Sequence, residues 1–471
     1  MKHKIKEFIS NSSYTLTSNF ITLLISTLMI LIVPKIIGVE EYGYWQLYLF
    51  YSAYVGFLHF GWTDGIYLKY GGKEYRDLNK NLFFSQFYML IVLQLFFAIT
   101  VSGVAFLIIE NPNRIFIVQM ISLNLLILNV RSMLVFILQG TNRIKEFANI
   151  TILDRLLYFS LILSFLLLGI YDYQVIILGD LIGKFLSLLL AIYFCRDIVF
   201  GKINKIRFLL SEVLDNISIG IKLMFASLTS TLIIGVVRFG IERNWDVSTF
   251  GKISLTLSIS NFVMIFVNSL GIVIFPLLRR VEENSLAKIY VNIRSLLMVF
   301  LLSLLIFYFP IKLALISWLP DYKDSIAFMS LVFPMIIFEG KTSLLINTYL
   351  KTLRKEKFLL NVNVLTLIVS ITLTFITAFV FENLSLTILT IVVLLAFRSV
   401  IAEIYIGKLL NISVYKNIFF DIILSIIFII TAWFLDSWMM TYLYVLSYIL
   451  YLFLVKKDLL EFKKLYKKMK N

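Results

Sequence analysis

Runs of about twenty mainly apolar residues recur along the whole chain, separated by short polar segments. A helix of this length crosses the hydrocarbon core of a bilayer, where only helices and closed barrels satisfy their own backbone hydrogen bonds. Hydrophobic residues fill 60% of the 471 positions and charged residues only 15%, a balance that a water-soluble core cannot accommodate. We therefore predict an all-α polytopic membrane protein.

The apolar runs predict about fourteen transmembrane helices. They cover residues 12–33, 44–60, 82–109, 115–138, 150–170, 175–194, 217–237, 253–278, 294–318, 326–350, 358–380, 384–409, 418–435 and 438–455. This pattern divides the chain into an N-terminal six-helix lobe (1–195), a cytoplasmic linker (196–215), a C-terminal six-helix lobe (216–410), two extra helices (411–455) and a basic amphipathic cytoplasmic tail (456–471).

A short motif occurs at the start of the second and of the eighth predicted span. Residues 39–47 and 247–255 both begin with Val and end with Leu, and they carry the pairs Tyr42 with Gly43 and Phe250 with Gly251. Because about six spans separate the copies, both have the same orientation, which implies two lobes related by a pseudo-two-fold axis along the membrane normal. Chance alignment in so apolar a chain is the alternative.

The chain carries 43 Lys and Arg against 28 Asp and Glu, a formal net charge of +15. The basic residues concentrate in alternate loops, and such loops stay in the cytoplasm during insertion. We therefore expect both termini on the cytoplasmic side of a bacterial inner membrane, and no nucleic-acid partner. In the tail 456–471 lysines surround an apolar helical face, which is expected to lie on anionic lipid headgroups; a solvated tail is the alternative.

Cysteine and histidine are scarce. Cys195 is the only cysteine, and the two histidines are His3 and His59. No intramolecular disulfide can form, and no spacing of metal ligands is present, so we assign neither a metal site nor a cofactor.

Polar residues recur at helical spacing in the first predicted span, where two-lobed transporters would place a cargo-binding face. They are Asn11, Thr15, Ser18, Asn19, Thr22 and Ser26, and the eighth span repeats the pattern with Ser254, Ser258, Asn261 and Asn268. We take Asn19 and Thr22 as candidate cargo contacts. Helix packing through small polar residues is the alternative.

Four basic residues lie well inside predicted spans, where an ionisable group is costly unless it is used or paired. They are Arg131, Lys184, Lys341 and Arg398. We expect all four to be candidate binding residues for an anionic cargo, since Lys and Arg attract phosphate and Arg matches its oxygens with a planar fork.

The alternative for these residues is pairing with an acid. Asp180 precedes Lys184 by four residues, a favourable helical spacing, and Arg398 is expected to pair with Glu403. Glu339 shares a span with Lys341. Arg131 has no acid near it in sequence and is the strongest candidate, with an acid of another span as its alternative partner. Arg155 and Lys222 lie nearer span ends, where they can reach the headgroups.

Several of these features resemble the O-antigen and capsule type oligosaccharide-lipid flippases, the polysaccharide transporter branch of the multidrug/oligosaccharidyl-lipid/polysaccharide exporter superfamily. The residues that carry the resemblance are Pro34, Gly38, Tyr42 and Gly43 in PKIIGVEEYG, the segment FLHFGWTDGIYLKYGG at 57–72, and Phe250, Gly251 and Pro276. The resemblance covers nearly the whole chain. It implies two six-helix bundles with two extra helices, and structural or gating roles for Pro34, Gly43, Asp64, Gly251 and Pro276.

The resemblance further implies a monomer that moves an undecaprenyl-diphosphate-linked oligosaccharide from the cytoplasmic to the outer leaflet by alternating access. Its partners would be this polyprenyl-diphosphate-linked glycan, membrane lipids and the glycan polymerase machinery. Related lipid II flippases carry arginines in the first span, whereas residues 12–33 hold only neutral polar groups, which disfavours that cargo. The alternatives are a small-molecule or drug antiporter of the same superfamily and, less favoured, a membrane glycan polymerase or ligase; we expect a protein that is not an enzyme.

Overall fold

The computed structural model describes residues 2–201, 210–278, 283–435 and 437–470, and the side chains of 2–10, 12, 263, 265–278, 283–285 and 457–470 lie outside that description. Every regular element in the described segments is a helix. The chain forms two compact units, Met1–Leu228 (unit 1) and Thr229–Asn471 (unit 2). Part of the predicted linker, residues 202–209, lies outside the described residues, and the predicted domain limits stay predictions.

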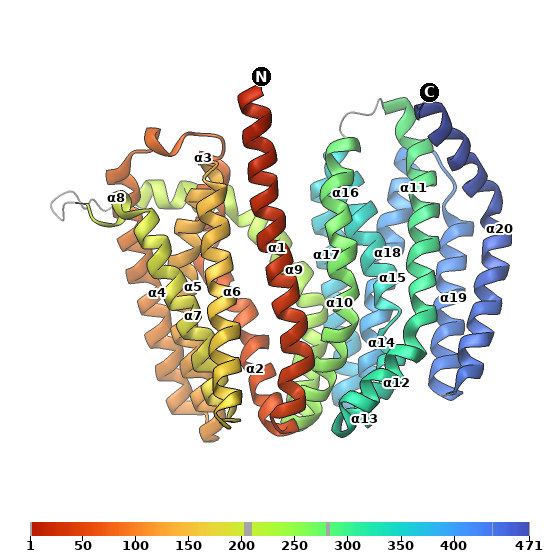
Figure 1. The fold of residues 1–471 in the computed structure, drawn as a ribbon, viewed down its shortest axis with the longest axis horizontal. Coiled ribbons are helices and arrows are strands. Elements are labelled where there is room, and N and C mark those ends of the chain that lie inside the picture. The colour runs from red at the N-terminus through yellow and green to blue at the C-terminus, as the bar shows by residue number, and fades with distance from the viewer. Residues whose placement is uncertain (1, 202–209, 279–282, 436, 471) are drawn as a thin grey trace. The chain divides into compact units, whose positions relative to one another are not determined.

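Unit 1 is a bundle of long helices (Figure 1). Helix α4 packs against α5, α6 packs against both α7 and α1, and α2 lies against α5 and α7. The elements are α1 (Lys2–Ile36), α2 (Val39–Val55), η1 (Gly56–His59), α3 (Trp62–Tyr70), η2 (Tyr75–Asp77), α4 (Lys80–Ile108), α5 (Pro112–Gly140), α6 (Ile144–Leu167), α7 (Tyr173–Phe194), α8 (Arg196–Val199) and the first part of α9 (Leu210–Asn244).

Unit 2 contains the rest of α9 and a second set of long helices. Its α17 packs against α18, α15 against α18, and α20 against both α11 and α19 (Figure 1). The elements are α10 (Val247–Leu278), α11 (Glu283–Leu304), η4 (Leu305–Phe307), α12 (Tyr308–Trp318), η5 (Pro320–Tyr322), α13 (Lys323–Ala327), α14 (Met329–Val332), α15 (Met335–Lys341), the π-helix η6 (Thr342–Ile346), α16 (Asn347–Thr352), α17 (Glu356–Thr374), the π-helix η7 (Phe375–Val380), α18 (Leu384–Leu410), α19 (Tyr415–Phe434) and α20 (Trp438–Lys470).

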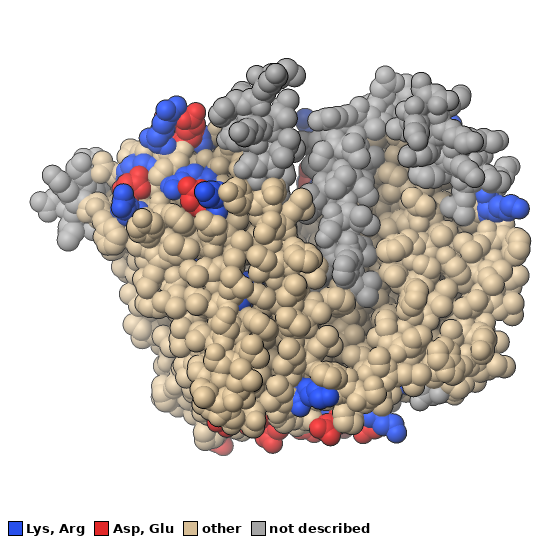
Figure 2. All heavy atoms as spheres, in the orientation of Figure 1, with Lys and Arg blue, Asp and Glu red and all other residues tan. Residues whose placement is uncertain are grey.

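Within the described residues, 12 helices are long and apolar enough to cross a membrane, which confirms the all-α polytopic membrane fold. The other two of the fourteen predicted spans correspond to α2, which has only 17 residues, and to α10, whose second half carries side chains outside the description. On the face shown in Figure 2, the flanks of both units are predominantly uncharged and charged side chains gather toward the helix ends. Helix α20 continues through the predicted tail to Lys470.

The second predicted span is broken where α2 gives way to η1 and α3. Phe60 and Gly61 both adopt left-handed backbone conformations, with φ of 55° and 80°. A Cβ atom on Gly65 would lie 1.8 Å from the carbonyl oxygen of Asn216, and one on Gly220 would lie 2.0 Å from that of Gly61. Helix α3 therefore crosses the start of α9, inside unit 1, at a distance that only glycines permit.

The two copies of the repeated motif occupy the same place in their helices. Helix α2 begins at Val39 and α10 begins at Val247, the first residues of the two copies. The backbone N–H of Tyr42 donates to Gly38 at 2.9 Å and that of Phe250 donates to Asp246 at 3.0 Å, and both rings are buried. Each unit thus starts a helix in the same way from the same motif, while the predicted pseudo-two-fold relation between lobes stays a prediction.

Candidate functional site

Arg131, on α5, is bound by groups from two neighbouring helices. Its Nη1 donates to Oδ2 of Asp154 on α6 at 2.7 Å and to Oγ of Ser187 on α7 at 2.6 Å. The sequence analysis gave an acidic residue of another span as the alternative partner of Arg131, and that residue is Asp154. Within the described residues, Nε and Nη2 of Arg131 make no hydrogen bond, and the side chain is 15% exposed, so one edge of the guanidinium stays available.

A second polar group lies on α5, seven residues before Arg131. Asn124 is fully buried, and neither Nδ2 nor Oδ1 of its amide has a hydrogen-bond partner in the part of the chain that the structure describes. Burying an amide without a partner costs roughly 1–3 kcal/mol. Two polar groups on α5 therefore retain hydrogen-bonding capacity that the described residues do not use.

Lys184 forms the intrahelical pair that its spacing predicted. Its Nζ donates to Oδ2 of Asp180 at 2.6 Å, and the hydroxyl of Tyr48 donates to the same oxygen at 2.7 Å. The Lys184 ammonium also lies 5.7 Å from the centre of the Tyr48 ring. This cluster joins α2 to α7, and its charges are locally compensated.

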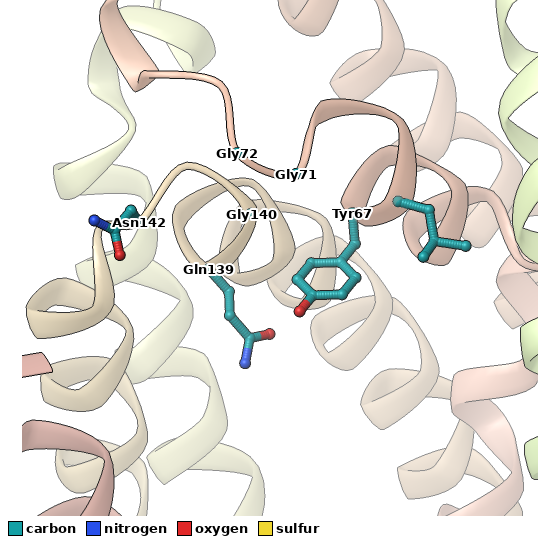
Figure 3. Close-up of a pocket in the computed structure, with 7 residues that line it drawn as sticks. Tyr67, Gly71, Gly72, Gln139, Gly140 and Asn142 are labelled. Carbon is teal, nitrogen blue, oxygen red and sulfur yellow. The ribbon is translucent and has the colours of Figure 1, made fainter. Parts of the chain in front are cut away.

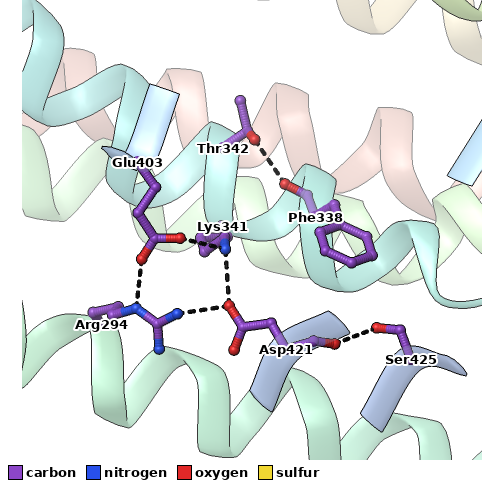
Figure 4. Close-up of polar contacts among 7 residues, drawn as sticks. All are labelled: Arg294, Phe338, Lys341, Thr342, Glu403, Asp421 and Ser425. Carbon is purple, nitrogen blue, oxygen red and sulfur yellow. Dashed lines mark hydrogen bonds and ion pairs between the residues drawn. The ribbon is translucent and has the colours of Figure 1, made fainter. Parts of the chain in front are cut away.

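Lys341 belongs to a ring of four buried charges in unit 2 (Figure 4). Its Nζ donates to Oε2 of Glu403 at 2.5 Å and to Oδ2 of Asp421 at 2.8 Å. Arg294 donates from Nε to Glu403 and from Nη2 to Asp421, both at 2.6 Å. The four side chains are at most 2% exposed and come from α11, α15, α18 and α19, so the ring joins four helices with no net charge.

Arg398 does not bind Glu403, and that predicted pair is wrong. Its Nη2 binds Oε2 of Glu339 on α15, and its Nη1 donates to Oγ of Ser230 at 3.2 Å. Residues five apart on a helix point about 140° away from each other, so Glu403 faces the buried ring while Arg398 faces elsewhere. Glu339 and Lys341, two residues apart, likewise point in different directions and bind different partners.

Arg294 and Asp421 are members of the ring that the sequence prediction missed. Both stood at the edges of predicted spans, 294–318 and 418–435, where a charge lies close to the headgroup region and is less costly than at the centre of the bilayer. Helix α11 begins earlier, at Glu283, which moves Arg294 into the interior of the span. The signal for Asp421 was present, since it is the one acidic residue of the apolar helix α19.

The polar residues of α1 fall into two groups. Ser18 is buried and its hydroxyl donates to the backbone oxygen of Thr15, while the Asn11 amide donates to Asn142 Oδ1, each at 3.0 Å. Asn19 is exposed and Thr22 half-buried, and the side chains of both lack hydrogen-bond partners within the described residues. Because an unpaired amide is unfavourable in hydrocarbon, Asn19 and Thr22 are suited to a polar surface.

The residues expected to be structural or gating elements lie near helix ends or breaks. Pro34 is buried in the last turn of α1, and Gly43 and Gly251 are buried just after the first turns of α2 and α10. The Asp64 carboxylate, in the first turn of α3, lies 3.7 Å from Nε2 of His59, and burial raises the pKa of Asp64 to about 6. Pro276 is part of α10, but its side chain lies outside the description.

Comparison with known proteins identifies relatives by fold only. No protein-family model matches the sequence, and no curated protein matches it. Among solved structures, the lipid II flippase MurJ in an inward closed conformation aligns with a TM-score of 0.66 and 12% identity over 96% of this chain and 100% of its own.

Transporters of another kind share the same fold. A MATE family multidrug resistance transporter of the MOP superfamily aligns in its inward-facing conformation with a TM-score of 0.59 and 11% identity, over 83% of this chain and 98% of its own. An outward-facing one aligns with a TM-score of 0.52 and 11% identity, over 86% and 96%. At such identities the similarity establishes a multi-pass membrane protein with a transporter fold, and it leaves the cargo open.

Proposed function

We propose that this protein is a transporter of the multidrug/oligosaccharidyl-lipid/polysaccharide exporter superfamily that flips a lipid-linked oligosaccharide. The cargo would be an undecaprenyl-diphosphate-linked repeat unit, of O-antigen, capsule or similar type, carried from the cytoplasmic to the outer leaflet of a bacterial inner membrane by alternating access. A sugar-diphosphate head group cannot cross hydrocarbon alone, because its charges and hydroxyls would lose their hydration without compensation. A membrane protein that supplies polar and cationic partners removes that barrier.

The proposal rests mainly on the edge of the Arg131 guanidinium that makes no hydrogen bond within the described residues. Asp154 and Ser187 both bind Nη1, so the remaining edge of the guanidinium, with Nε and Nη2, is unused by the described residues. Two parallel N–H groups on one edge match two phosphate oxygens. The pair with Asp154 also keeps Arg131 oriented and compensated while no cargo is bound.

The other candidate residues differ in how well their contacts suit binding of this cargo. Asn19 and Thr22 would bind sugar hydroxyls or the water that accompanies them, because their side chains have no partner within the described residues. Lys184 and Arg398 would add positive potential, although each already contacts a carboxylate. Lys341 is fully buried between two carboxylates, and we propose that it holds helices together.

A small-molecule antiporter is the second candidate, since MATE structures share the fold. A carrier of cations would be expected to present a carboxylate that is not already neutralised. Five of the six carboxylates described above contact Lys or Arg: Asp154, Asp180, Glu339, Glu403 and Asp421. The sixth, Asp64, lies outside the candidate spanning helices and 3.7 Å from His59. This favours an anionic cargo over a cationic one.

A membrane glycan polymerase or ligase is less favoured. Such an enzyme needs catalytic groups presented on a substantial segment outside the bilayer. When the 3-10 elements are counted as helices, the longest of the described connections is residues 168–172. The monomeric state, the polymerase machinery as a partner and the two six-helix lobes at 1–195 and 216–410 belong to the same proposal.

Depletion of the protein in its native host tests the cargo. The proposal expects the lipid-linked oligosaccharide to accumulate on the inner leaflet while the finished surface polymer disappears; a surface polymer that persists, or no accumulating intermediate, would overturn it. Lipid extraction followed by mass spectrometry identifies the intermediate.

Substitutions at Arg131 test the site. Arg131→Ala is expected to abolish export and Arg131→Lys to restore it only in part, because Lys lacks the planar fork. The double variant Arg131→Gln with Asp154→Asn removes the ion pair without leaving a lone buried charge. If Arg131 binds cargo, this variant inserts normally and still fails to export; recovered export would reduce Arg131 to a structural role. Arg114→Ala, at the other end of α5, is the matched control.

A further inference from the structure

A pocket opens in unit 1 where the C-terminal ends of α3 and α5 meet (Figure 3). Its volume is about 550 Å³, within the range of small-molecule sites. The backbone N–H of Gly72 donates to the carbonyl of Gly140 at 2.9 Å and holds the two chain segments together. The lining residues are Tyr67, Leu68, Gly71, Gly72, Gln139, Gly140 and Asn142.

Two side chains present hydrogen-bonding groups to this pocket. In Figure 3 the amide of Gln139 and the hydroxyl of Tyr67 extend into the same space. Neither group has a hydrogen-bond partner within the described residues, whereas the Asn142 amide, at the rim, accepts from Asn11 at 3.0 Å. The pocket therefore offers an aromatic face, an unused donor and acceptor pair and a phenol.

The lining carries no charge, although basic loops surround it. Lys69 is bound by Glu212 at 2.7 Å and by Asp215 at 2.5 Å. Arg143 is bound by Glu146 at 2.8 Å. Lys73, the residue after Gly72, lies with its ammonium 4.8 Å from the centre of the Tyr70 ring and makes no ion pair within the described residues. The lining itself offers a neutral molecule rich in hydroxyls groups that both donate and accept, whereas a phosphate would have to find its counter-charge outside the lining.

We propose that this pocket binds a sugar residue of the transported glycan and contributes to the choice of cargo. The assignment rests on the proposed flippase function. Gln139 would bind adjacent hydroxyls through both amide atoms, and the Tyr67 ring would cover the C–H face of the sugar. Gln139 follows Arg131 by eight residues on α5, about 12 Å along the helix axis, so one head group can reach a sugar pocket and a phosphate-binding arginine on the same helix.

The test measures binding of free sugars to the purified full-length protein in lipid nanodiscs, with no lipid carrier, no phosphate and no transport. Saturation-transfer NMR with N-acetylglucosamine and with galactose is expected to give a saturable signal for at least one sugar. Gln139→Leu should weaken binding about tenfold, the effect of one lost hydrogen-bonding group. Gln119→Leu, the same change on the same helix outside the pocket, should leave it unchanged.

The outcomes of these experiments test the pocket assignment and the proposed function separately. No saturable signal from the unmodified protein, or equal signals from Gln139→Leu and Gln119→Leu, would overturn the pocket assignment and leave the depletion experiment unaffected. Tyr67→Phe, which keeps the ring and removes the hydroxyl, should retain part of the binding. If depletion fails to accumulate a lipid-linked oligosaccharide, the proposed function falls, and with it the role of the pocket in cargo choice.

Discussion

Arg131 and Lys341 are both basic residues inside spanning helices, and they differ in how much of their charge the protein itself uses. Lys341 binds two carboxylates and is completely enclosed. Arg131 binds one carboxylate through one nitrogen and remains partly exposed. A charge that is fully compensated and buried contributes to specific packing, while one with an unused donor edge can still bind a ligand.

The buried ring in unit 2 makes a direct prediction about stability. Lys341→Met leaves Glu403 and Asp421 with a single counter-charge, Arg294, and an uncompensated buried charge typically lowers the free energy of unfolding by about 3–5 kcal/mol. Thermal unfolding of the purified protein measures the loss. Lys351→Met, at the exposed end of the same span, should have little effect.

A second substitution separates charge balance from simple loss of contacts. Adding Asp421→Asn to Lys341→Met restores electroneutrality, since Arg294 and Glu403 then remain as a pair. The double variant should be more stable than Lys341→Met alone. If it is less stable, the ring stabilises through its hydrogen bonds and the electrostatic explanation is wrong.

At this scale the sequence locates charges and does not identify their partners. Lys184 and Asp180 were predictable because both lie on one helix at a spacing with known geometry. Asp154, the partner of Arg131, lies 23 residues away on another helix, and only the packing of α5 against α6 brings it within 2.7 Å. The same limitation produced the wrong pair of Arg398 with Glu403.

At the scale of elements, the contact between α3 and α9 is a close crossing of two helix backbones. It is supported by polar bonds on either side: Lys69 binds Glu212 and Asp215, and the Asn216 and Trp62 side chains both donate to Gln86 Oε1, at 2.8 and 2.9 Å. Helix α9 continues from this contact into unit 2, so the contact fixes the start of the helix that connects the two units.

Gly65→Ala should disrupt this crossing. The new methyl group would meet the backbone of Asn216, which cannot move aside as a flexible side chain would, so the two helices must separate. We expect a clear loss of thermal stability and of expressed protein. Gly103→Ala, on α4, has open space around its Cβ and should be neutral or stabilising, given the higher helix propensity of Ala. Equal stability of the two variants would contradict the close crossing.

The break in the second predicted span is a feature that hydropathy does not predict. Hydropathy alone extends that span from 44 to 60, because Gly56, Phe57 and Leu58 are apolar or neutral. The chain leaves the helix at Val55, and the left-handed residues Phe60 and Gly61 start a new one. Gly56 and Gly61 were the available signal, but a glycine in an apolar span also serves close helix packing, and sequence alone does not separate the two uses.

For the whole molecule, composition was sufficient to predict the all-α membrane fold, since an apolar content of 60% leaves few other solutions. The repeated motif added more, because Val39 and Val247 both prove to be the first residues of their helices. The cargo could not be predicted in this way. Similarity to MurJ and MATE structures at 11–12% identity indicates how the chain folds, while cargo depends on individual side chains, for which we propose Arg131 and Gln139.

The orientation of the chain in the membrane is a prediction from the charges of its loops, and thiol labelling measures it directly. The positive-inside rule places the basic loop between α3 and α4 in the cytoplasm and the loop between α6 and α7 outside. In spheroplasts, a membrane-impermeant maleimide should therefore label Tyr171→Cys, and should label Glu74→Cys only after the membrane is disrupted. Cys195 is completely buried, which keeps the native background low. The reverse pattern would place both termini outside, and cargo flipping toward the outer leaflet would then have to begin at the opposite end of α5.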